Sequence, residues 1–218
     1  MDYRWDFAAV LLPPEFWLLG AVYTVVYAIG TSLAGCLIGM VLGSLMLSRR
    51  RLVTWPIDAY VQLFRCTPLM VQIVWFYYAL PVVIGASMPS WFAAGIGLSL
   101  YMGAFTTEIF RAGVLSIEAG QWQAARAVGL SYIQALRLVI LPQAARRMVP
   151  PLVSQSVLQL KNTALLSVVA IPELMHRSAV IVSETFRPLE TYTAVAGMYF
   201  VLLYPLVALS RRLEMKWE

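Results

Sequence analysis

A lysine and four uncharged polar residues interrupt an otherwise apolar stretch late in the sequence. Lys161 is followed directly by Asn162 and Thr163, and Gln155 and Gln159 lie on the preceding turns of an expected helix. An ammonium group with amide and hydroxyl neighbours is suited to binding a carboxylate. The alternative is that Lys161 bridges helices and donates to their carbonyl oxygens. In either case, a helix with so many polar side chains is not expected to face lipid on all sides.

A second set of reactive side chains lies in earlier apolar stretches. Arg65 and Thr67 immediately precede Pro68, and Glu108 falls within the next apolar stretch. The guanidinium fork of Arg65 is also suited to a carboxylate. Glu108 can instead form a structural ion pair with Arg65, with Arg111 or with a partner chain. Pro68 removes a helical hydrogen bond and therefore predicts a kink next to Thr67.

The composition determines the class of protein that must position these residues. Of 218 residues, 61% are hydrophobic and 12% are charged, whereas an average soluble domain has about 25% charged residues. The chain is therefore expected to be an all-α integral membrane protein forming one domain over residues 1–218. The net charge of +5 is interpreted as an orientation signal rather than as a nucleic-acid surface. We predict no metal site and no catalytic residues.

Five membrane spans are expected, because each needs about 20 apolar residues. Basic residues give their orientation: with the amino terminus outside, eleven fall on the inner face and three on the outer face, which predicts a cytoplasmic carboxyl terminus. The expected spans are Leu18–Leu47, Ile57–Leu80, Trp91–Arg111, Val149–Ala170 and Tyr192–Ser210. The inner set is Arg49, Arg50, Arg51, Arg111, Arg126, Arg137, Arg146, Arg147, Arg211, Arg212 and Lys216, and the outer set is Arg4, Arg177 and Arg187.

Two further features concern contacts between elements or with other proteins. Gly35, Gly39 and Gly43 recur every four residues in the first span, which lets another helix approach closely. That helix belongs either to this chain or to a sister subunit. The connection from Pro172 to Pro188 is expected to be an outer loop, and its acids contribute to a mildly acidic outer surface suited to protein docking. Ordinary solvation of the loop explains these charges equally well. That surface consists of Asp2, Asp6, Glu15, Glu173, Glu184 and Glu190.

A polar segment at about residues 116–142 separates the third and fourth spans. Ala124, Ala125 and neighbouring residues favour a short exposed helix. Gly129 ends that helix or permits a close turn, and Ser131 can cap the next helix. After Ser131, apolar residues recur at helical spacing, which indicates an amphipathic helix along the membrane surface. Pro142 is expected to end that helix and redirect the chain. The segment reads as a cytoplasmic docking surface.

This segment resembles the EAA motif of ABC importer permeases. The resemblance rests on Gln123-Ala124-Ala125, Gly129, Val139 and Leu141-Pro142 at the motif's spacing. Three further stretches are similar to the polar amino acid branch of these permeases, so that the resemblance covers essentially the whole chain. They are FRCTPLMVQ from Phe64, EIFRAGV from Glu108 and VILPQAARRMVPPL from Val139. Two residues depart from the motif: Gln123 replaces its leading glutamate and Val139 its usual isoleucine.

The resemblance implies the type I ABC importer permease fold, located in a bacterial inner membrane. It implies an ABC ATPase dimer that carries ATP and Mg, a second permease subunit of the same or a paralogous kind, and a periplasmic or surface solute-binding protein. Gln123–Gly129 would be the coupling helix in an ATPase groove, and Val139–Pro142 would pass its displacement on. Gln123 can form a hydrogen bond to the ATPase but not the motif's salt bridge.

The substrate implied by the resemblance is a polar amino acid or a related compound. The expected substrate-pathway residues are Lys161, Asn162, Thr163, Arg65, Thr67, Gln159 and Glu108. The sequence leaves acidic, basic and neutral amino acids open, and also conjugates such as opines. The alternative function is an ion-coupled secondary transporter, although the chain lacks the internal repeats usual in that class. A purely structural membrane subunit is a third possibility.

Overall fold

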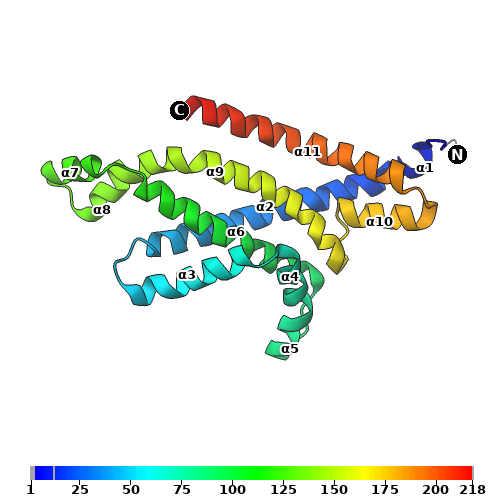
Figure 1. The fold of residues 1–218 in the computed structure, drawn as a ribbon, viewed down its shortest axis with the longest axis horizontal. Helices are drawn as coiled ribbons and strands as arrows, with labels where there is room; N and C mark the ends of the chain where they lie inside the picture. Colours follow the sequence, from blue (N-terminus) through cyan, green and yellow to red (C-terminus); the bar gives the residue numbers. More distant parts are fainter. Residues whose placement is uncertain (1–2, 12, 218) are drawn as a thin grey trace.

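The computed structural model describes residues 3–11 and 13–217, and within them every regular element is helical. Figure 1 shows the long helices running roughly side by side, with α7 and α8 at one end and the N-terminus and α10 at the other. The α-helices are α1 (Ala8–Leu11), α2 (Pro14–Leu45), α3 (Arg51–Cys66), α4 (Leu69–Val74), α5 (Leu80–Ile84), α6 (Ser90–Leu115), α7 (Ala119–Ala127), α8 (Tyr132–Ala135), α9 (Leu141–Asn162), α10 (Leu174–Thr185) and α11 (Pro188–Trp217).

Helices α2 and α6 form the closest pair in the bundle. Gly35, Gly39 and Gly43 lie against α6 so closely that a Cβ at Gly39 would collide with Thr106. The Thr106 hydroxyl donates to the Gly35 carbonyl at 2.7 Å. Of the two interpretations of the glycine spacing, the structure therefore supports packing within this chain. This face of α2 is covered by α6 and is not free for a sister subunit.

Helix α6 is long enough to cross a membrane, since its 26 residues extend about 39 Å. It nevertheless contains many small and hydroxyl residues, among them the buried Gly103, Thr106 and Thr107. These residues permit close approach by α2, α3 and α9, whereas a lipid-facing helix would be more uniformly apolar. The central helix is thus less apolar because protein surrounds it.

The expected second span is not one helix. The chain bends by 108° between Arg51–Cys66 and Leu69–Ile84, and α4 and α5 lead away from the long helices (Figure 1). Pro68 lies at the bend in an extended conformation. Gln72 closes the break by donating to the carbonyl oxygens of Phe64 and Thr67. The predicted kink is confirmed, and it divides the expected span Ile57–Leu80 into two helices. The backbone acceptors freed at the break are satisfied by the Gln72 side chain.

The fourth span is longer than expected and is continuous with the segment before it. The helix runs from Tyr132 to Val169 and ends in a 3₁₀ turn. Pro142 was expected to end an amphipathic helix, and this is wrong. A π-helical turn over Leu136–Ile140 lets the Leu141 N–H donate to the Leu136 carbonyl, which accommodates the proline that follows. The same arrangement precedes Pro81, where the Leu80 N–H donates to the Trp75 carbonyl.

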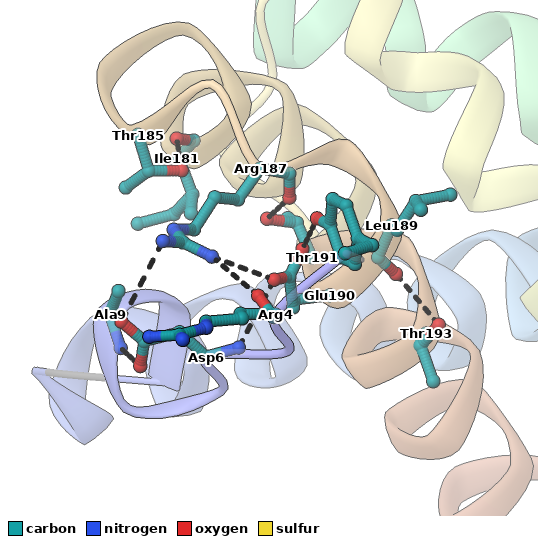
Figure 2. Close-up of polar contacts among 11 residues, drawn as sticks. Arg4, Asp6, Ala9, Ile181, Thr185, Arg187, Leu189, Glu190, Thr191 and Thr193 are labelled. Atoms are coloured by element: carbon teal, nitrogen blue, oxygen red, sulfur yellow. Dashed lines mark hydrogen bonds and ion pairs between the residues drawn. The ribbon is translucent and has the colours of Figure 1, made fainter. Parts of the chain in front are cut away.

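The outer connection contains a helix, α10, which packs against α2. Glu173 caps this helix by accepting from the backbone N–H groups of Met175 and His176, and it also accepts from the Tyr199 hydroxyl. Glu190 binds the N-terminal segment and Arg187 (Figure 2). Both carboxylates are completely buried. The acidic docking surface is therefore wrong for these two residues, which serve structural roles instead.

By length and apolarity, two helices in the described part of the chain can cross a membrane alone, Pro14–Leu45 and Pro188–Arg212. Two bent pairs qualify when each is taken as one span: Arg51–Ile84 and Tyr132–Thr185. These two helices, the two bent pairs and α6 make five segments, and each corresponds to one of the five expected spans. In Figure 1 the α2–α3 connection lies at the same end as α7 and α8.

Candidate functional site

The first candidate site is the exposed helix α7 with the turn that follows it. Gln123, Ala124 and Arg126 are exposed, and only Ala125 among the α7 residues is buried. Gly129 has a φ of +83°, a left-handed conformation that favours glycine. The Leu130 N–H donates to the Ala125 carbonyl and the Gly129 N–H to the Arg126 carbonyl, the pair of bonds of a Schellman motif. The predicted end of the helix at Gly129 is confirmed.

The next helix begins with a capping box. The Ser131 side chain accepts from the Gln134 N–H, and the Gln134 side chain accepts from the Ser131 N–H. These reciprocal bonds satisfy two terminal donors and confirm the predicted cap. Because one tight motif ends α7 and another begins α8 directly after it, the angle between the two helices is defined by the backbone bonds of the first motif and the side chain–backbone bonds of the second.

Apolar side chains anchor this segment to the bundle. Ile140 is completely buried with Val114 and Ile117 of the α6 end and with Ala144 and Met148 of α9. Val139 and Leu141 pack against this cluster, whereas Pro142 is exposed. A displacement of α7 would therefore be passed to α6 and α9 together, because closely packed side chains move as a body.

Two side-chain contacts fix α7 against the long helix. The Trp122 and Tyr132 rings stack with centroids 5.2 Å apart and an interplanar angle of 17°. Gln143 donates to the Gln121 side chain at 3.1 Å. We call these four residues the α7 clamp. Sequence reasoning missed the clamp, because the positions of Trp122 and Tyr132 are related only through the intervening turn.

The second candidate site is a groove of about 580 Å³ between α9 and α11. Lys161 is exposed in it, together with Arg211 and Arg212. Apolar and aromatic residues of α11 form most of its wall: Phe200, Leu203, Tyr204, Val207, Ala208 and Met215. The groove thus combines an apolar wall with three cationic side chains.

A hydrogen bond between Ser154 and Ser210, at 3.0 Å, sets the register of α9 against α11. Lys161 lies two helical turns beyond Ser154, about 10 Å along α9, while Arg211 follows Ser210 directly. The three cations are consequently spread along the groove rather than gathered at one point. From the sequence, Arg211 and Arg212 are only orientation signals, since nothing in the sequence indicates which helix α11 contacts.

The polar neighbours of Lys161 are mostly enclosed. Gln159 is completely buried and donates to the Thr31 hydroxyl at 2.9 Å and to the Leu98 carbonyl at 3.0 Å, which ties α9 to α2 and α6. Thr163 is also completely buried and donates to the Leu160 carbonyl. Both residues are predicted to line a pathway; in the structure Gln159 links three helices, whereas the Thr163 bond lies within its own helix. Asn162 is half-buried, and its side-chain nitrogen has no hydrogen-bond partner among the described residues.

Arg65, Thr67 and Glu108 lie apart from this groove. Arg65 Nη1 is 3.7 Å from Glu108 Oε2, and the Arg65 guanidinium lies over the Phe105 ring. Thr67 donates to the Leu63 carbonyl and accepts from Gln72 at the α3–α4 break. The structure therefore brings Arg65 and Glu108 together as the ion pair that the sequence left open. It does not bring them to Lys161.

Known proteins share this arrangement of helices. A chain in a crystal structure of an amino acid ABC transporter with histidines is 28% identical, matches 98% of this chain and 100% of its own length, and superposes with a TM-score of 0.91. A chain of the inward-facing MetNI methionine ABC transporter is 20% identical over 94% of this chain and 97% of its own, with a TM-score of 0.78. The second likeness shows the fold alone.

Two curated relatives span almost the same length. The arginine transport system permease protein ArtQ of Bacillus subtilis is 31% identical over 211 residues, 97% of this chain and 96% of its own. The glutamine transport system permease protein GlnP of Escherichia coli K12 is 35% identical over 192 residues, 86% of this chain and 88% of its own. The fold is that of type I ABC importer permeases. Since the family model also matches residues 35–217, this chain belongs to the family of binding-protein-dependent transport system inner membrane components.

Proposed function

We propose that this protein is the permease subunit of an ATP-driven ABC importer that moves polar amino acids or related compounds across a bacterial inner membrane. The observation that carries the proposal is α7, an exposed helix closed by a Schellman motif at Gly129 and anchored to both α6 and α9. Relatives named as arginine and glutamine permeases support the substrate class.

In this proposal the chain itself breaks no covalent bond. Two ATPase subunits bind ATP and Mg, and α7 docks in a groove on one of them. Gln123 and Ala124 form the exposed contact surface, with Ala125 behind them. Movement of α7 passes through Val139, Leu141 and Pro142 into α9. Alternating access follows when two permease subunits, identical or paralogous, change their relative packing around the solute.

The groove beside Lys161 is the proposed solute-contacting surface of this subunit. Lys161 is accessible there, with Asn162 adjoining it. Arg65, Thr67 and Glu108 contribute at the α3–α6 side of the proposed pathway, while the buried Gln159 and Thr163 support the helix that carries Lys161. A solute-binding protein would deliver the amino acid at the end formed by the N-terminus and α10, with the carboxyl terminus on the cytoplasmic side.

The test is to isolate a tagged copy from its own membranes in mild detergent and to identify stoichiometric partners by mass spectrometry. An ABC ATPase is expected with the wild type. It should be lost from the variants Gln123→Arg and Gly129→Val, which place a charge and a strained β-branched residue in the contact.

Gly120→Ala is the matched control, because a Cβ at Gly120 meets no atom within 4 Å. It should retain the ATPase. If no ATPase accompanies the wild type while other importers from the same membranes stay intact, the proposal fails. An ion-coupled secondary transporter then becomes the better explanation, and its uptake would persist without ATP.

A further inference from the structure

Helix α3 carries an exposed apolar stripe along its outer side. Leu52 is 92% exposed and Trp55 is 75% exposed. Figure 1 shows α3 at the edge of the bundle, where it contacts α2 and α6. Successive members of the stripe are three or four residues apart, so they share one side of the helix. The stripe consists of Leu52, Trp55, Ala59 and Leu63, all exposed.

Three consecutive arginines precede this stripe. Arg49 and Arg50 belong to the α2–α3 connection, Arg51 is the first residue of α3, and all three are exposed. A guanidinium group can bind a phosphate through two parallel N–H groups. The single acid of α3, Asp58, follows Arg51 by seven residues, which places it about 10 Å farther along the helix. The start of α3 therefore combines three cations with an apolar surface that begins at the next residue.

The other end of the stripe leads into a groove of about 540 Å³ at the α3–α4 break. Leu63 belongs to both the stripe and the groove, whose other lining residues are mostly apolar or aromatic, among them Val71 and Trp75. From Leu52 to Leu63 the helix rises about 16 Å. One leaflet of a hydrocarbon core about 30 Å thick has nearly the same depth, about 15 Å. An acyl chain whose headgroup lies at the arginines would therefore reach the groove.

We infer that the α2–α3 connection and the apolar stripe bind an anionic phospholipid of the surrounding membrane. The phosphate contacts Arg50 and Arg51, and one acyl chain follows the stripe into the groove. This inference goes beyond the proposed transport function and does not depend on the solute. With the proposed orientation, the lipid belongs to the cytoplasmic leaflet.

A second copy of this chain is the competing occupant of the stripe. The sequence contains no two adjacent acidic residues, so a second copy offers no compact negative surface to match three consecutive arginines. An anionic headgroup supplies that charge, and its acyl chains supply the apolar contact at the same time. Charge complementarity therefore favours the phospholipid.

The test incubates the tagged chain, isolated from its own membranes in mild detergent with whatever partners accompany it, with equal amounts of two lipids. These are phosphatidylglycerol and phosphatidylcholine with the same acyl chains, and mass spectrometry quantifies what the re-isolated protein retains. Wild type should retain phosphatidylglycerol in clear excess. The double variant Arg50→Gln/Arg51→Gln should lower that retention at least tenfold, because each arginine near an anionic surface strengthens the attraction about fivefold.

The matched control for charge is Arg137→Gln/Arg146→Gln, which removes two cations from exposed positions outside the α2–α3 connection. It should retain phosphatidylglycerol within about twofold of wild type. Equal retention of both lipids by wild type overturns the inference. An equal loss in the two double variants also overturns it, because the lipid would then respond only to the overall positive charge.

The groove is tested separately by Val71→Phe, which adds bulk to its lining from an exposed position. Retention of phosphatidylglycerol should fall at least threefold. Val82→Phe is the matched control, because Val82 is 81% exposed on α5 and does not line the groove, and it should behave like wild type. If Val71→Phe instead releases a second copy of the chain while lipid retention is unchanged, the groove is a subunit interface and the inference fails.

Discussion

Some polar residues in this protein are buried and hydrogen-bond neighbouring helices together, whereas others are exposed and can contact a solute. Gln159 is completely buried and ties three helices together, while Lys161, two positions later, is exposed in a groove. Both had been assigned to the same pathway, because adjacent polar residues cannot be told apart by type alone. The structure separates them, since residues two positions apart on a helix point in different directions.

Lys161→Ala should abolish solute uptake without preventing assembly. Removing the ammonium takes away the proposed carboxylate contact and leaves no buried acid unpaired, so folding should be little affected. Uptake in cells and basal ATP hydrolysis by the purified complex are the two measurements. Normal uptake would remove Lys161 from the pathway, whereas loss of the assembled complex would show a structural role.

Gly39→Ala should destabilise the bundle strongly. The added Cβ would collide with Thr106 on α6, and overpacking a close contact costs about 1–3 kcal/mol. Gly30→Ala on the same helix should be tolerated, because a Cβ there meets nothing within 4 Å. The thermal midpoint of the purified protein should fall by several degrees for the first variant only. Equal midpoints would show that α2 and α6 are not closely packed.

At the scale of elements, the prolines show how the helices tolerate residues that normally end them. Pro81 and Pro142 each follow a π-helical turn in which the preceding leucine N–H reaches back five residues. The turn lets the proline join without breaking the helix. For this reason α8 and α9 join into one long helix, and α7 is a separate short helix packed against it.

The variants Trp122→Ala and Tyr132→Ala should uncouple ATP hydrolysis from transport. Either change removes the ring stack of the α7 clamp, a contact worth about 0.5–1.5 kcal/mol beyond its buried area. The number of ATP molecules hydrolysed per solute should rise severalfold. Tyr132→Phe keeps the stacked ring and should couple normally. Unchanged coupling in both alanine variants would show that the capping motifs alone fix α7.

At the scale of the whole molecule, the N-terminal segment is bound to the last helix. Glu190 accepts from the Asp6 N–H at 3.1 Å, from Arg187 at 2.9 Å and from the Tyr3 hydroxyl, and Figure 2 shows Arg187 reaching both Glu190 and the Arg4 carbonyl. The hydrogen bond to Glu190 raises the pKa of Tyr3 above its usual value, with a smaller contribution from burial. The phenol therefore remains a donor throughout the physiological pH range.

Glu190→Gln should release the N-terminal segment from α11. The amide carries no charge to pair with the half-buried Arg187, and the hydrogen bonds from the Asp6 N–H and the Tyr3 hydroxyl lose a charged acceptor. Hydrogen exchange in residues 3–11 should become at least tenfold faster. Glu184→Gln, at an exposed position of α10, should leave that exchange unchanged. Equal protection in both variants would show that the α1 contacts alone hold the segment.

The sequence by itself determined the helical membrane class, the approximate positions of the spans and the exposed helix ended by Gly129. These follow from composition, hydrophobic periodicity and local turn chemistry, which depend on residues close together in the chain. The position of Val139 in the motif and the capping role of Ser131 can also be predicted from the sequence, since a motif's spacing or a capping box involves residues close together in the chain.

Only the tertiary structure decided which polar residues are enclosed and which share a surface. Glu173 and Glu190 are buried because backbone N–H groups and distant side chains satisfy them, and no local pattern predicts such partners. Lys161 and Arg211 share a groove because α9 and α11 pack in one register. Register between helices distant in sequence depends on the packing of many side chains at once, so it becomes visible only in the folded chain.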